Sequence, residues 1–172
     1  MAISRLNHAV LYVRDAQRSA RFYSDVLGFR VVMSMGDRAV FVQAPDSTND
    51  HDLGLFSVGD GAGASPAGRS TVGLYHLAWE VQTLSDLVDL REKLATAGAL
   101  VGASDHSTSK SLYGQDPDGI EFEIAWLVPA DRIDDAVLHG RSSIAPLDLD
   151  AEIARYGADT TGGIGVSTAA LS

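Results

Sequence analysis

Hydrophobic and polar residues along this chain follow an order that occurs twice. In the first pass, residues 7–13 alternate like a half-buried strand, and residues 16–29 carry apolar side chains at helical spacing. Gly28 stands where a helix commonly ends, and residues 30–58 hold three short apolar runs separated by turn residues. This half of the pattern predicts a strand, a helix and three further strands.

The second pass repeats that order. Residues 75–81 predict a strand, the helix that follows ends at Gly98, and three more strands extend to residue 126. His76 follows His8 by 68 positions, so the two opening strands carry a histidine at matching places. The sequence therefore predicts an internal repeat of two βαβββ modules and an α+β fold.

The repeat also sets the expected domain boundaries. The modules span residues 4–58 and 73–128 and together make one domain over residues 1–128. Residues 59–72 are rich in Gly and Ala and predict a flexible linker. Residues 129–172 form a C-terminal extension with one short predicted helix, which could serve as an arm across a neighbouring copy or as a lid.

Composition limits the classes of function open to the chain. Hydrophobic residues make up 45% and charged residues 21%, as in ordinary globular proteins. The formal net charge of -10 argues against a nucleic-acid partner. Cysteine is absent, which excludes disulfides and thiolate zinc sites, and no apolar run approaches the roughly 20 residues of a membrane span. We expect a soluble, cytoplasmic protein with no membrane partner.

Three residues on predicted strands suit a metal site, namely His8, His76 and Glu123. The histidines occupy equivalent positions of the repeat, and Glu123 lies in mid-strand on the polar side of an alternating segment. Two neutral imidazoles and one carboxylate on a divalent ion leave roughly three coordination positions for substrate and O₂. The pattern therefore indicates a metalloenzyme.

The segment DPDGIEFE, residues 116–123, resembles the closing hairpin of the vicinal oxygen chelate superfamily, in which the last glutamate is a metal ligand. NHAVLYV and YHLAWEV resemble the strands that carry the family's two histidine ligands. The resemblance is nearest to the type I extradiol ring-cleaving dioxygenases. It implies a cupped mixed β-sheet around one Fe(II) ion, with Mn(II) or Zn(II) also suited to the ligands. It further implies cleavage of a catechol-like aromatic diol with O₂.

The same resemblance implies three further site residues. His51 matches the histidine that the family places beside the O₂ site as acid–base catalyst, and histidine can take and return a proton near neutral pH. His106 and Tyr113 match a histidine and a tyrosine that line the family's substrate pocket and hydrogen-bond the diol. Together they imply a complete catalytic set for ring cleavage.

Two alternative functions stay open at this point. Where the repeat would place a counterpart of Glu123, a glyoxalase I-type enzyme usually carries a second glutamate, but this chain has Leu55. The alternatives are a metal-dependent glyoxalase-like lyase or isomerase, and a non-catalytic small-molecule-binding protein of the same fold. Metal content separates the binding protein from both enzymes, and O₂ uptake separates the dioxygenase from the lyase. The exposed sheet edges of such modules predict a homodimer or higher homo-oligomer.

Overall fold

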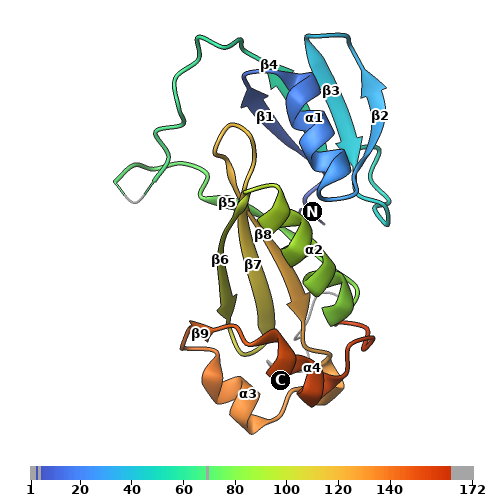
Figure 1. Ribbon diagram of the computed structural model, residues 1–172, viewed down its shortest axis with the longest axis vertical. Coiled ribbons are helices and arrows are strands. Elements are labelled where there is room, and N and C mark those ends of the chain that lie inside the picture. The colour runs from blue at the N-terminus through green and yellow to red at the C-terminus, as the bar shows by residue number, and fades with distance from the viewer. Residues whose placement is uncertain (1–2, 4, 69, 164–172) are drawn as a thin grey trace. The chain divides into compact units, whose positions relative to one another are not determined.

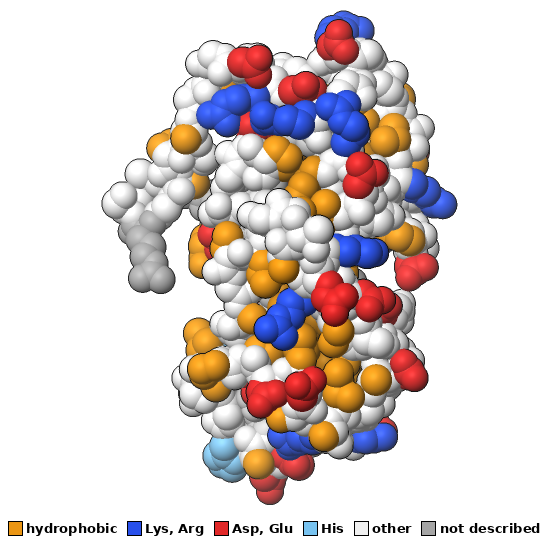
Figure 2. Space-filling model, viewed as in Figure 1, with side chains coloured by type: hydrophobic (Ala, Val, Ile, Leu, Met, Phe, Trp, Pro, Cys, Tyr) orange, Lys and Arg blue, Asp and Glu red, His pale blue; other side chains and the backbone are white. Residues whose placement is uncertain are grey.

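The computed structural model describes residue 3, residues 5–68 and residues 70–163 (Figure 1). On the face shown in Figure 2, charged side chains of both signs lie among hydrophobic ones. Across the described ranges, no helix is long and apolar enough to cross a membrane.

The chain divides into two compact units. The first contains the residues up to Pro66 and, from much later in the chain, the hairpin tip Asp116–Ile120. The second contains Ala67–Gln115 and the residues from Glu121 onward. The boundary after Pro66 falls inside the segment for which the sequence predicts a linker.

A four-stranded mixed sheet with one helix makes up most of the first unit (Figure 1). Its strands lie in the order β1-β4-β3-β2, with β1 parallel to β4 and the other neighbours antiparallel. This is the βαβββ arrangement that the sequence predicts. The elements, in chain order, are β1 (Ala9–Val13), α1 (Ala16–Asp25), β2 (Arg30–Ser34), β3 (Ala39–Gln43) and β4 (Leu53–Ser57).

Local sequence explains where α1 begins, what it buries and where it ends. The Asp15 carboxylate accepts hydrogen bonds from the backbone N–H groups of Gln17 and Arg18, which satisfies two free donors of the first turn. The apolar stripe of the helix is buried against the sheet, with Tyr23 1% exposed. Gly28 has a φ of 77°, a left-handed conformation that glycine adopts without steric cost.

The second unit repeats this plan and adds a fifth strand. Its sheet order is β5-β8-β7-β6-β9, with β5 parallel to β8 and the other pairs antiparallel. The elements, in chain order, are β5 (His76–Glu80), α2 (Leu84–Thr96), β6 (Leu100–Asp105), β7 (Ser109–Gln115), β8 (Glu121–Leu127), the 3₁₀ helix η1 (Ala130–Arg132), α3 (Asp135–Gly140), β9 (Ala145–Pro146) and α4 (Leu149–Tyr156).

Alternation along β8 decides which side chains enter the core of the second unit. Phe122, Ile124 and Trp126 are each at most 2% exposed and lie on the side of the sheet that α2 covers. Glu121 and Glu123 are half-buried and point to the opposite face. The sequence prediction that this strand separates an apolar face from a carboxylate face is therefore confirmed.

The C-terminal extension packs on the second unit as far as residue 163. The short helix predicted in the extension corresponds to α4, whereas α3 and β9 had no clear signal in the sequence. Lys110 on β7 is 1% exposed and forms ion pairs with Asp105 at 2.5 Å and with Glu152 of α4 at 3.0 Å. The Trp126 indole donates a hydrogen bond to the carbonyl of Thr160 at 3.2 Å. Residues 164–172, the remainder of the predicted arm or lid, lie outside the described residues.

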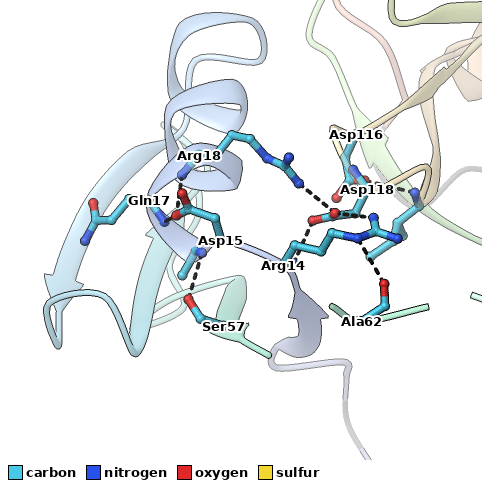
Figure 3. A network of polar contacts seen from close by, with 10 residues as sticks. Arg14, Asp15, Gln17, Arg18, Ser57, Ala62, Asp116 and Asp118 are labelled. Atoms are coloured by element: carbon cyan, nitrogen blue, oxygen red, sulfur yellow. Dashed lines mark hydrogen bonds and ion pairs between the residues drawn. The ribbon is translucent and has the colours of Figure 1, made fainter. Parts of the chain in front are cut away.

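Two arginines hold the hairpin tip within the first unit (Figure 3). Arg14 Nη1 and Arg18 Nη2 lie 2.7 and 2.6 Å from Oδ1 of Asp118, and the Arg14 backbone N–H donates to Oδ2 at 3.0 Å. Burial alone would raise the pKa of the Asp118 carboxyl, but these hydrogen bonds outweigh burial and hold its pKa below the usual range. The carboxylate is therefore kept charged by both arginines.

Candidate functional site

The first unit brings His8 and His51 together. His8 directly precedes β1, and His51 lies on the loop between β3 and β4. Because β1 runs parallel to β4, with the Ala9 N–H donating to the carbonyl of Asp52 at 2.9 Å, the residues just before each strand become neighbours. The centroids of the two imidazole rings are 4.6 Å apart. Phe41 on β3 meets His51 edge-on, with ring centroids 5.0 Å apart.

Each of these histidines has one ring nitrogen engaged by its preceding residue. Nδ1 of His8 lies 2.7 Å from Oδ1 of Asn7, and Nδ1 of His51 lies 2.9 Å from Oδ2 of Asp50. A neutral imidazole that donates from Nδ1 presents the lone pair of Nε2. His8 can therefore offer Nε2 to a metal ion, and His51 can offer Nε2 to a proton.

Apolar side chains surround His8 and His51 on their face of the first sheet. Val10 and Tyr12, which share the His8 side of β1, are 52% and 75% exposed. Phe41 and Phe56 pack edge to face on the neighbouring strands, with centroids 5.7 Å apart. This face suits a planar hydrophobic group better than a charged one.

The second unit brings His76 and Glu123 together on neighbouring strands. Nε2 of His76 on β5 lies 3.1 Å from Oε2 of Glu123 on β8, and both side chains are largely buried, at 25% and 15% exposed. The register pairs His76 with Glu121 and Ala78 with Glu123, so both side chains rise from one face of the sheet. Nδ1 of His76 is buried and has no hydrogen-bond partner among the described residues. The two donor atoms already converge as two ligands of one small cation would.

Tyr113 and His106 complete this face. Tyr113 on β7 pairs directly with Glu123 on β8, and its hydroxyl lies 2.7 Å from Nε2 of His106. Burial, the charge of Glu123 and the nearby Tyr75 raise the pKa of Tyr113 to about 12. The phenol therefore keeps its proton at neutral pH and can donate a hydrogen bond to an anionic oxygen.

The six predicted site residues thus fall into two groups. His8 and His51 lie together in the first unit, and the second unit holds the others in contact: His76, Glu123, Tyr113 and His106. Among the described residues, no group of three or more His, Asp or Glu side chains is arranged so that it could hold a metal ion. Within the second unit, the His76–Glu123 pair offers one imidazole nitrogen and one carboxylate oxygen, donor types that divalent first-row metals bind.

Sequence reasoning missed the residues that orient the histidines. Asn7 and Asp50 each precede a site histidine directly and bond its Nδ1. A polar residue immediately before a candidate histidine is the only local signal for this role, and surface loops contain many such pairs.

Comparison with known proteins decides the family. The model described as Glyoxalase/Bleomycin resistance protein/Dioxygenase superfamily matches residues 5–124. The chain belongs to this superfamily. A crystal structure of a glyoxylase/bleomycin resistance protein/dioxygenase domain from Frankia sp. EAN1pec is 29% identical, with a TM-score of 0.59 over 72% of this chain and 92% of that chain. The fold and the superfamily expected from the sequence are confirmed.

Two curated relatives are dioxygenases by name. The chain is 30% identical over 121 residues to catechol-2,3-dioxygenase of Bacillus subtilis (strain 168). It is 34% identical over 121 residues to biphenyl-2,3-diol 1,2-dioxygenase 3 of Rhodococcus globerulus. Each match covers 70% of this chain, but only 41% and 62% of the respective relative. The chain thus spans about half the length of these proteins.

Proposed function

We propose that this protein is an Fe(II)-dependent extradiol-type dioxygenase that cleaves a catechol-like aromatic ring with O₂. The observation that carries the proposal is the hydrogen bond between His106 and Tyr113 beside the His76–Glu123 pair on one sheet face. A His–Glu pair that can hold a metal ion, next to two hydrogen-bonding side chains, suits a diol that is chelated and oriented at once. The names of the two dioxygenase relatives support the same chemistry.

In this proposal His8, His76 and Glu123 hold the metal ion, and Mn(II) or Zn(II) would also suit these ligands. Bound iron would act as a Lewis acid that lowers the pKa of the diol hydroxyls and would supply the redox chemistry toward O₂. The chain's own residues bind and orient the substrate. Tyr113 donates its phenolic hydrogen bond to a substrate oxygen, and His106 fixes the direction of that phenol.

His51 serves as the acid–base catalyst. Its Nδ1 is engaged by Asp50, so Nε2 is the nitrogen that accepts the second hydroxyl proton of the diol and later returns it. The rings of Phe41 and His8 hold the His51 ring in place. The apolar face around them would exclude water from the reacting ring.

Oxygen consumption tests the proposal. Protein purified without O₂ and loaded with Fe(II) should consume O₂ with a panel of substituted catechols and form yellow ring-cleavage products. Metal binding without O₂ uptake on any member of the panel would overturn the dioxygenase assignment in favour of a lyase or isomerase. Failure to bind metal would point to a binding protein of the same fold.

A matched pair of variants tests the ligand set. Glu121 and Glu123 lie two residues apart on the same face of β8. Glu121 is the register partner of His76, but it is the Glu123 carboxylate that lies 3.1 Å from Nε2 of His76. Glu123→Gln should lower metal affinity at least about 10-fold, whereas Glu121→Gln should leave it unchanged. Equal metal content in both variants, measured by elemental analysis, would remove Glu123 from the ligand set.

A further inference from the structure

A buried polar cluster closes the loop that carries His51. Asp52 is 8% exposed, and its carboxylate accepts three hydrogen bonds from that loop. The donors are the Ala44 backbone N–H at 2.8 Å, the Ser47 hydroxyl at 2.8 Å and the Asn49 side-chain amide at 2.7 Å. The Asp52 carboxylate therefore holds together the loop from Ala44, its first residue, to Asn49.

Gln43, at the end of β3, holds the same loop from the other side. It is 7% exposed, and its amide nitrogen donates to the carbonyls of Ser47 and Asn49. Its amide oxygen accepts from Nε of Arg30 at 2.6 Å, which fixes the orientation of the amide. Buried groups that satisfy each other in this way hold one loop conformation, because any other would leave polar atoms unpaired.

The backbone of Asp52 connects the cluster to the sheet. Its N–H donates to the carbonyl of Val42 on β3 at 2.9 Å, and its carbonyl accepts from Ala9 on β1 at 2.9 Å. His51 is the next residue back along the chain, so its Cα is fixed between β1 and β3. That placement brings the imidazole onto the rings of His8 and Phe41.

We infer that Asp52 is a positioning residue for His51. By closing the loop over residues 44–52, its carboxylate sets the place and direction of the His51 ring, while the carboxylate itself contacts no reacting atom. This inference rests on the proposed acid–base role of His51. Displacing a catalytic histidine by about 1 Å from its proton-transfer geometry costs on the order of 100-fold in rate. Loss of a positioning residue should therefore lower the turnover rate more than it weakens substrate binding.

Nuclear magnetic resonance tests the positioning independently of activity. In metal-free wild-type protein, the His51 ring should show nuclear Overhauser contacts to the Phe41 ring. Asp52→Ala should abolish these contacts, and Asn49→Ala, which removes one of the three donors, should weaken them. Asp46→Asn, an exposed acid of the same loop, should keep them. Retention of the contacts in Asp52→Ala would overturn the inference, and if that variant does not fold, full retention in Asn49→Ala would overturn it equally.

Kinetics then separate positioning from general stability. Asp52→Ala should lower kcat by about 10- to 100-fold with less than about a threefold change in KM. Added to His51→Phe, the same substitution should lower kcat less than about twofold further, because the group through which it acts is already gone. Fully additive losses would overturn the inference. If the wild type consumes no O₂ while the Asp52→Ala contacts are lost, the proposed function fails and the positioning stands.

Discussion

The hydroxyl of Tyr113 and Nε2 of His106 lie 2.7 Å apart, in a hydrogen bond that joins β7 to the residue after β6. The same phenol pairs across the sheet with Glu123, the proposed metal ligand. A substrate oxygen bound beside Glu123 would therefore meet an oriented donor without any rearrangement of the chain.

Removing that donor should weaken catalysis. Tyr113→Phe should lower kcat/KM by about 10- to 100-fold, since it deletes one hydrogen bond to a charged oxygen, and metal content should stay unchanged. Tyr156→Phe is the matched control, because the Tyr156 hydroxyl has no hydrogen-bond partner among the described residues. Steady-state O₂ uptake on both variants measures the difference. A Tyr113→Phe enzyme as active as the control would show that the phenol takes no part.

His51 should matter for turnover and not for metal binding. His51→Phe should retain the wild-type metal content while kcat falls by about 10²- to 10⁴-fold, the usual contribution of an acid–base group. His139→Phe, at an exposed position of α3, serves as the control for a histidine replaced elsewhere. Unchanged kcat in the His51 variant would leave this residue as an ordinary loop histidine.

The buried Lys110 should stabilise the attachment of α4 to the second unit. Lys110→Ala removes the cation between Asp105 and Glu152, and we expect a loss of about 2–4 kcal/mol in the free energy of unfolding. Lys110→Met should cost less, because it keeps the buried methylene chain. Lys93→Ala, on the exposed side of α2, should change stability by less than about 0.5 kcal/mol. Urea unfolding, with limited proteolysis of residues 129–163, provides the measurement; equal stabilities of the two alanine variants would contradict the expectation.

The Asp118 ion pairs predict a dependence of stability on pH with a definite sign. The folded-state pKa of Asp118 lies below its unfolded value, so its contribution is fully present above about pH 4 and is lost as pH falls through the folded-state pKa. Asp118→Asn should therefore destabilise the protein by about 1–3 kcal/mol at pH 7 and by clearly less at pH 2.5.

At each pH, the quantity to compare is the difference in the free energy of unfolding between the wild type and Asp118→Asn. Burial raises the pKa of the neighbouring Asp116, whose own contribution changes with pH in the opposite direction. Urea unfolding of both proteins at the two pH values cancels that background. A wild-type advantage that stays constant between pH 7 and pH 2.5 would show that the charge of Asp118 is not what the arginines stabilise.

The sequence by itself determined the elements of both βαβββ modules and the family of this protein, but not α3 and β9. The cap at Asp15, the glycines Gly28 and Gly98 that follow the two module helices, and the alternation along β8 are each local patterns of a few neighbouring residues. Interactions between residues close in the sequence can be inferred from the sequence itself, so both βαβββ modules could be predicted. The six candidate site residues came from the repeat and from the resemblance, and their joint role around one metal ion stays a prediction, as does the homodimer.

Only the tertiary structure showed which buried partners hold the His51 loop and the C-terminal helix α4 in place. Asp52 is joined to β1 through the Ala9 N–H, 43 positions back along the chain, and the burial of Lys110 depends on Glu152, 42 positions further along it. An isolated acid or lysine in the sequence predicts a solvated surface group, because burial without a partner is costly. Only when the chain folds and brings distant partners within hydrogen-bond reach do these residues become buried and take a part in the site or in stability.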